Sequence, residues 1–145
     1  MNAHGEAVTI IVYGDPAPQG SKRHVGNGRM IESSKAVKPW RDSVAWAGRE
    51  VMGDRPPLDG PLMARIVFTL RKPASAPKKR RIYPDRKPDL SKLLRSTEDA
   101  LVTAGVIADD ARIVAFTELA KCYPNEGVSA LTAPGAFITV WRVEV

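Results

Sequence analysis

The chain has only one cysteine and two histidines, which excludes several kinds of site. A single cysteine cannot form an internal disulfide, and so few thiols and imidazoles do not make a zinc cluster. No apolar run approaches the roughly 20 residues that a membrane span requires. The first residues also lack the basic-then-apolar pattern of a signal peptide. We therefore expect a soluble, cytoplasmic protein.

The length of 145 residues fits a single domain, which we expect to span residues 1–145. Hydrophobic residues make up 43% of the chain and charged residues 26%, an ordinary globular composition. A chain of this size can bury roughly two-thirds of its unfolded surface, so it needs neither disulfides nor metals to fold.

Positive charge is concentrated in one proline-rich segment, residues 71–88. The net charge is +6, and eight of the 22 basic residues lie between Arg71 and Lys87, with Asp85 as the one acid among them. The rest of the chain holds 14 basic and 15 acidic residues, so this segment carries the whole excess. Such a segment indicates a polyanion-binding surface. The alternative is a solvated loop that happens to be basic.

Apolar periodicity predicts an α/β (α+β) fold in which a mixed sheet packs with two main helices. The two helices are predicted over 37–52 and 90–103, because apolar residues recur there at helical spacing. Gly26–Gly28 is predicted as a hairpin tip. The predicted strands cover 8–13, 29–32, 62–70, 113–119 and 136–145. Residues 71–88 are predicted to form a long basic loop before the second helix.

Three aspartates flank the second predicted helix. Asp89 stands where an N-cap is expected, whereas Asp109 and Asp110 open the strand that follows the helix. These acids therefore belong to opposite ends of the helix, and only a tilted helix or a second chain element would bring them together. Their alternative roles are structural: a helix cap for Asp89 and a polar turn for the pair.

Carboxylates beside a basic loop suggest a metal-dependent nuclease. Mg²⁺ prefers carboxylate oxygens together with waters and phosphate oxygens, and it activates the attacking water while neutralising charge on the phosphate. A basic loop next to such acids would hold DNA over them. A DNA-binding protein without a metal gains nothing from these carboxylates, because they repel phosphate.

The central motif of the chain resembles that of RusA-like Holliday junction resolvases. Residues 87–95 read KPDLSKLLR, residues 99–101 read DAL, and residues 109–111 read DDA. The family pattern is approximately K-P-D-L-D-K/N-L-x-K/R, then D-A-L, then a D-D pair opening a strand. Residues 14–23 (GDPAPQGSKR), residues 121–123 and the closing strand from Gly135 are also similar. The resemblance covers nearly the whole chain.

The resemblance implies a homodimeric nuclease that nicks four-way DNA junctions in recombination, repair or phage DNA processing. It implies Mg²⁺ as cofactor, with Mn²⁺ as a possible substitute, and a bacterial or phage-infected host cell. Asp89 and Asp110 match catalytic metal ligands, and Arg95 matches a basic helical residue that assists catalysis. Asp109 is the flanking acid of the pair and a further candidate ligand.

Ser91 departs from the family pattern, because an aspartate is expected there. A hydroxyl is a weaker Mg²⁺ ligand than a carboxylate and adds no charge. Three interpretations remain open: a weak natural enzyme, a branched-DNA-binding protein with little or no cleavage, or compensation by another acid. Glu98, two helical turns after Ser91, is the candidate for compensation. The structural alternative for Glu98 is an edge residue reaching water.

The remaining candidates concern DNA contacts and aromatic residues. Trp40, Trp46 and Trp141 are expected in the core rather than stacked on bases. A nuclease for flaps or other branched intermediates is a further functional alternative. The predicted DNA-binding residues are Lys22, Arg23, Lys78, Lys79, Arg80, Arg81, Arg86, Lys87 and Lys92.

Overall fold

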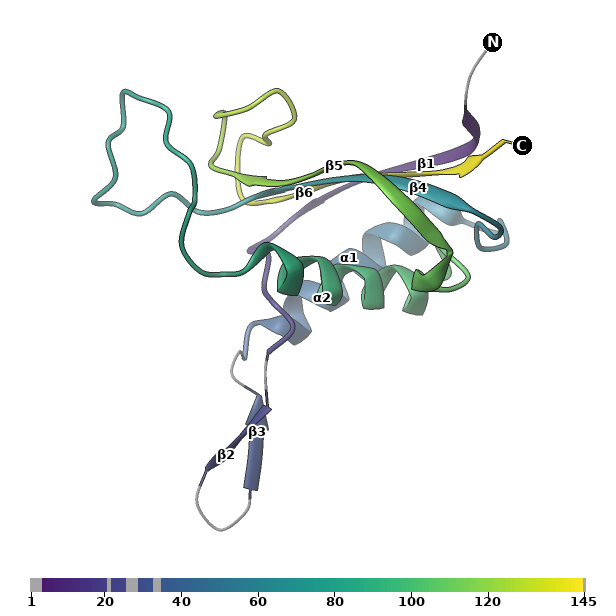
Figure 1. The fold of residues 1–145 in the computed structure, drawn as a ribbon, viewed down its shortest axis with the longest axis horizontal. Coiled ribbons are helices and arrows are strands. Elements are labelled where there is room, and N and C mark those ends of the chain that lie inside the picture. Colours follow the sequence, from purple (N-terminus) through teal and green to yellow (C-terminus); the bar gives the residue numbers. More distant parts are fainter. Residues whose placement is uncertain (1–3, 21, 26–28, 33–34, 145) are drawn as a thin grey trace.

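The computed structural model describes residues 4–20, 22–25, 29–32 and 35–144. One four-stranded sheet has the order β1 (His4–Tyr13), β6 (Gly135–Val143), β4 (Leu62–Thr69) and β5 (Ile113–Cys122). Both helices cover the same face of this sheet (Figure 1). The strands of β1–β6 and β6–β4 are antiparallel, whereas β4 and β5 are parallel. A separate pair, β2 and β3, forms a hairpin that projects from the body on the helical side (Figure 1). The chain is thus a single α+β domain, as predicted.

The secondary-structure bounds follow the sequence pattern closely. Both predicted helices are confirmed at both ends: α1 spans Val37–Met52 and α2 spans Leu90–Thr103. A short 3₁₀ turn, η1, covers Asp110–Arg112. The strands are β1 (His4–Tyr13), β2 (Lys22–Val25), β3 (Arg29–Glu32), β4 (Leu62–Thr69), β5 (Ile113–Cys122) and β6 (Gly135–Val143). The predicted hairpin tip, Gly26–Gly28, lies outside the described residues.

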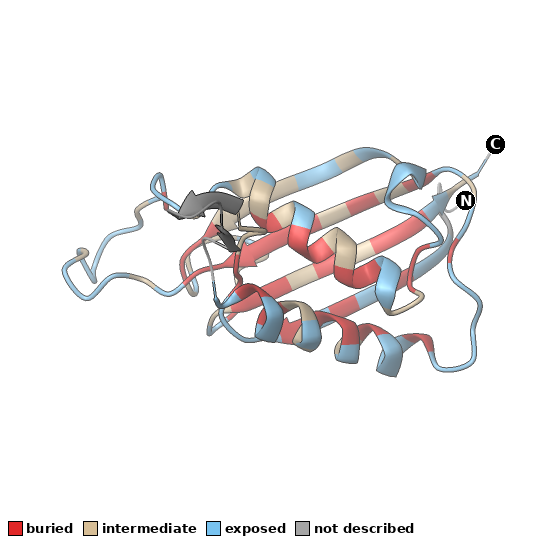
Figure 2. Ribbon diagram, turned by 90° about the horizontal axis from the view of Figure 1, so that it is seen from below, coloured by how far each residue is buried: buried red, intermediate tan, exposed pale blue. Residues whose placement is uncertain are grey.

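The core lies between the sheet and the two helices (Figure 2). Alternate residues of β4, from Leu62 to Phe68, point into it, since side chains of a strand alternate between faces. Trp40 of α1 is 2% exposed and donates its indole N–H to Thr97 Oγ1 of α2 at 3.2 Å. This bond satisfies the one polar atom of the buried indole and fixes α1 beside α2.

One of the three tryptophan predictions is wrong. Trp40 and Trp141 are buried, but Trp46 is 65% exposed. The buried face of α1 contains Trp40, Val44 and Gly48, at spacings of four residues. Trp46 lies two residues beyond Val44, on the flank of the helix, where it lines a cavity beside the edge strand β1 instead of packing into the core.

Gly135 occupies a position that no larger residue fits, and its replacement gives a test of the fold. A Cβ on Gly135 would lie 2.2 Å from the carbonyl oxygen of Val12, in the neighbouring strand. Gly135→Ala is therefore expected to lower the free energy of unfolding by about 2–3 kcal/mol, because backbone must move. Gly127→Ala is the matched control, since its nearest new contact would be an ordinary 3.6 Å. Thermal unfolding checks this, and equal melting temperatures for the two variants would contradict it.

Candidate active site

Asp89 is the N-cap residue of α2 and its carboxylate is half exposed. The side chain makes no capping hydrogen bond to the helix, so its oxygens remain available to a ligand. Lys92 Nζ lies 3.7 Å from Asp89 Oδ2. Gln19 is held beside them, because its N–H donates to the carbonyl of Lys92 at 3.0 Å. Asp89, Lys92 and Gln19 together line a cavity of about 400 Å³.

Lys121 of β5 anchors the chain just before Asp89. Its ammonium donates to the carbonyl of Arg86 at 2.7 Å and to that of Pro88 at 2.8 Å. The second bond fixes the residue that precedes Asp89. Lys121 therefore positions Asp89 against the sheet, a role that the sequence motif around Lys121 did not reveal.

Asp109 and Asp110 differ in what their carboxylates do. Asp109 caps η1, because its Oδ1 accepts the N–H of Ala111 at 3.0 Å. That bond, with a hydrogen bond from Asp110, lowers the pKa of Asp109. The same contact with Asp109 raises the pKa of Asp110, as does the nearby charge of Asp99. Asp110 is exposed, and the N–H of Ala111 partly offsets the rise in its pKa.

Apart from Asp109, the carboxylates that act on Asp110 come from the second half of α2. Asp99 lines a cavity of about 390 Å³ together with Asp109 and Asp110. Glu98 is half-buried, and burial together with the charges of Asp110 and Asp99 raises its pKa to about 7. The carboxylates of Glu98, Asp99 and Asp110 thus repel one another, which favours their protonated forms.

The raised pKa of Glu98 predicts a pH-dependent stability for the metal-free protein. A carboxyl whose folded-state pKa exceeds its unfolded value stabilises the fold fully below the unfolded pKa, and this contribution is lost as pH rises toward 7. Glu98→Gln is expected to remove this fall in the free energy of unfolding. The fall is on the order of 1 kcal/mol, because water screens the charge of a half-buried group. Urea unfolding at pH 5 and pH 8 measures this difference in the free energy of unfolding. Glu50 is exposed, so Glu50→Gln is the control. Parallel pH profiles for wild type and Glu98→Gln would contradict the prediction.

One copy of the chain does not bring Asp89 and Asp110 together. Helix α2 has 14 residues, so it is about 20 Å long at the usual rise per residue. Asp89 stands at its beginning, and Asp110 lines a cavity with Val102 and Thr103 at its end. Among the residues that the structure describes, no three acidic, cysteine or histidine side chains gather closely enough to hold a metal ion. Within one chain, the predicted ligands Asp89 and Asp110 thus lie at opposite ends of α2.

Three other predicted residues lie on one side of α2, which is exposed at its start and half-buried at Glu98. Ser91, Arg95 and Glu98 follow at spacings of four and three residues, so they share a face of the helix. Ser91 and Arg95 are exposed, and Ser91 lies in the first turn, two residues after Asp89. This stripe joins the Asp89 end of α2 to the Asp110 end.

The basic loop extends beyond the sheet next to the start of α2 (Figure 1). Arg71 pairs with Asp15 at 3.1 Å, and Lys72 pairs with Glu126. Glu126 also accepts the N–H of Ile82 at 2.9 Å and so closes the base of the loop. Six basic side chains of the loop are exposed and have no ion pair with any described residue: Lys78, Lys79, Arg80, Arg81, Arg86 and Lys87.

Because Arg71 and Lys72 are already paired with carboxylates, the basic side chains of the loop that remain available to a polyanion lie within residues 78–87. Arg81 stacks on the ring of Tyr83, with its guanidinium carbon 4.6 Å from the ring centre. Lys22 and Arg23 lie in β2 of the hairpin, but their side chains are outside the described part of the structure.

A comparison with known protein families shows the family of the chain. Residues 14–130 match the family model of the endodeoxyribonuclease RusA. The chain belongs to the RusA endodeoxyribonuclease family. No curated protein matches the chain significantly. The match covers more than half of the chain, including α1, α2, the basic loop and both ends of the α2 stripe.

Family membership establishes the class of activity. RusA-family proteins are Holliday junction-cleaving endodeoxyribonucleases, and the chain is a hydrolase of this class, connected with DNA recombination and repair. The substrate class is branched DNA. No described helix is long and apolar enough to cross a membrane.

Proposed function

We propose that the chain cleaves four-way DNA junctions as a Mg²⁺-dependent homodimer whose metal sites are each shared between two copies. The observation that carries this proposal is the position of Asp89 and Asp110 at opposite ends of α2. A metal ligated by both acids needs Asp89 of one copy and Asp110 of the partner subunit. Residues from two copies supply the donor set that one copy lacks.

The exposed stripe of α2 is suited to such pairing. A two-fold axis near its middle would run two α2 helices antiparallel, since a symmetric dimer uses the same surface on both copies. Asp89 of each copy would then approach Asp110 of the partner subunit. Val102 is 37% exposed at the end of the stripe and would be covered.

Mg²⁺ bound at this position would activate water and neutralise charge on the scissile phosphate. In this proposal Asp89 and Asp110 hold the metal, whereas Asp109 keeps its capping bond and contributes charge only. Ser91 contributes a hydroxyl close to Asp89. Arg95, one turn after Ser91, stabilises charge that develops on the phosphate. The basic loop, together with Lys92 and with Lys22 and Arg23 of the hairpin, binds the arms of the junction in the cytoplasm of a bacterial or phage-infected cell.

Cleavage of defined DNA substrates tests the proposal. Four-way junctions, flaps and linear duplex of equal length are incubated with Mg²⁺, with Mn²⁺ and with a chelator. We expect paired nicks in the junction with either metal, none with the chelator, and little cleavage of the duplex. Preferential cleavage of flaps, or metal-independent cleavage of junctions, would contradict the proposal.

A further inference from the structure

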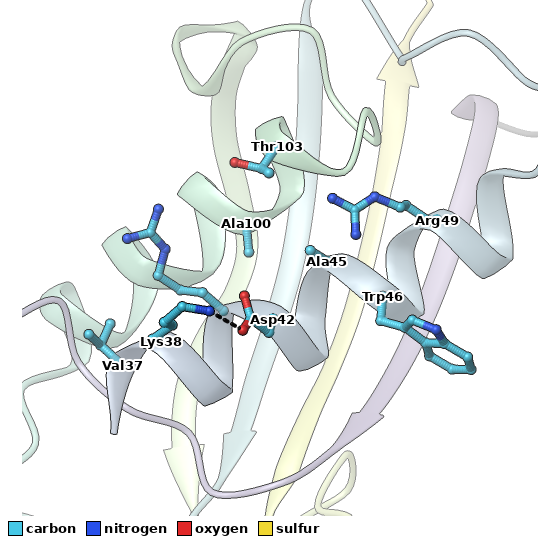
Figure 3. Close-up of a pocket in the computed structure, with 9 residues that line it drawn as sticks. Val37, Lys38, Asp42, Ala45, Trp46, Arg49, Ala100 and Thr103 are labelled. Carbon is cyan, nitrogen blue, oxygen red and sulfur yellow. Dashed lines mark hydrogen bonds and ion pairs between the residues drawn. The ribbon is translucent and has the colours of Figure 1, made fainter. Parts of the chain in front are cut away.

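A groove of about 640 Å³ runs between α1 and α2 on the side away from the sheet (Figure 3). Its floor contains two small residues, Ala45 of α1 and Ala100 of α2, which are 5% and 1% exposed. Larger residues at these positions would fill the space between the helices. The groove therefore results from the small residues at the point where the two helices cross.

The walls of the groove are positively charged. Lys38 and Asp42 form an exposed ion pair at 2.8 Å and so cancel each other. The other two charged lining residues are Arg41 and Arg49. Neither has a carboxylate at ion-pair distance among the residues that the structure describes. Arg49 reaches into the groove beside Ala45, whereas Trp46 points away from it (Figure 3).

The groove continues into the acidic cavity around Asp110. Arg41 and Thr103 line both spaces. A polymer lying along the groove would therefore pass from Arg49 to Arg41 and then reach the carboxylates. Two guanidinium groups followed by an acidic cavity suit a chain of phosphates that ends at a metal site.

The spacing of the two arginines fits a DNA backbone. Arg41 and Arg49 are eight residues apart on α1, which corresponds to about 12 Å along the helix. A duplex carries about three phosphates per strand over that length. Guanidinium groups bind phosphate oxygens with two parallel hydrogen bonds, so each arginine can hold one phosphate.

We propose that the groove between α1 and α2 binds the backbone of one junction strand through Arg41 and Arg49 and guides it to Asp110. This inference rests on the proposed function, because the strand it binds is the substrate of that reaction. It adds a second contact surface to the basic loop, on the helical face and next to the metal site. Arg41 is the groove residue closest to the chemistry, and Arg49 is the more distant contact.

Salt-dependent binding of a labelled four-way junction, measured by fluorescence anisotropy without divalent metal, tests the inference. Arg41→Ala and Arg49→Ala are each expected to lower junction affinity about 10-fold and to make the slope of log affinity against log salt shallower by about one. Alanine is a better helix former than arginine, so both variants are expected to fold. Arg41→Lys and Arg49→Lys keep the charge and are expected to retain most of the affinity.

Two controls separate failure of this inference from failure of the proposed function. Arg55 lies outside the groove and donates to the carbonyl of Val51, so Arg55→Ala is expected to match wild type. Arg80→Ala removes an exposed cation of the basic loop and is expected to weaken binding. If the Arg41 and Arg49 variants bind the junction as tightly as Arg55→Ala does, while Arg80→Ala binds weakly, the proposed role of the groove is wrong and the proposed function stands. Wild type without salt-dependent junction binding would overturn both.

Discussion

Asp110→Asn is expected to lower the rate of junction cleavage by about 100- to 1000-fold, a loss typical for removal of one charged group that stabilises the transition state. Asparagine keeps the size of the side chain but not its charge, so the metal loses a ligand. Junction affinity is expected to stay within a few-fold of wild type, or to rise slightly, because a negative charge that repels phosphate is gone. Single-turnover cleavage and junction binding, measured on the same preparations, separate the two effects.

Asp109→Asn is the matched control for this variant. The carboxylate of Asp109 caps η1 through the N–H of Ala111, and asparagine is an equally good capping residue. Its cleavage rate is therefore expected to fall much less than that of Asp110→Asn. A larger loss for Asp109→Asn than for Asp110→Asn would show that the ligand of the pair had been assigned to the wrong residue.

Ser91→Asp is expected to increase cleavage at limiting Mg²⁺ by about 10- to 100-fold, comparable with the effect of other residues that support a metal site. Ser91 is exposed in the first turn of α2, so a carboxylate fits there without repacking. A negative charge at a helix N-terminus is also favourable, by about 0.3–1 kcal/mol. The gain is expected as a lower Mg²⁺ concentration at half-maximal rate.

Ser91→Asn separates the charge of the new side chain from its size. Asparagine has the same size as aspartate but no charge, so this variant is expected to show the Mg²⁺ dependence of wild type. If Ser91→Asp leaves the Mg²⁺ requirement unchanged, Ser91 does not lie at the metal. A wild type that binds junctions without cutting them, together with a cleaving Ser91→Asp, would identify the chain as a binding protein with a vestigial site.

The two helices could be predicted from sequence because each carries a complete amphipathic pattern. Val37–Met52 and Leu90–Thr103 both begin and end where the apolar periodicity does. The bounds of the strands were harder to predict from the sequence. Strand β5 was predicted to end at Leu119 but extends to Cys122, because Ala120, Lys121 and Cys122 pair with the end of β4. Such pairing depends on a distant strand, and no local pattern of the sequence contains it.

The candidate site was predictable only in part, for the same reason. The motif at residues 87–95 and the aspartate pair identified the acids, but no local pattern gives the distance between Asp89 and Asp110. The anchoring of Pro88 by Lys121 joins residues 33 positions apart in sequence. Arg41 and Arg49 at helical spacing also look like an ordinary solvated face, and only the small floor residues Ala45 and Ala100 make a groove between them.

The shared metal site is the central claim, and it is tested most directly by mixing two inactive variants. In a dimer of one Asp89→Asn copy and one Asp110→Asn copy, one site loses both acids and the other keeps both. We therefore expect equal mixtures, after subunit exchange, to recover about a quarter of the wild-type sites. Because each mixed dimer has one working site, the product is expected to be a singly nicked junction.

A mixture of Asp89→Asn with the double variant Asp89→Asn/Asp110→Asn is the control, since no combination of these copies contains both acids. Subunit exchange is verified with two differently sized tags. We expect nicking in the first mixture and none in the control. A first mixture as inactive as its parents, although mixed dimers have formed, would contradict a metal site shared between Asp89 and Asp110 of two copies.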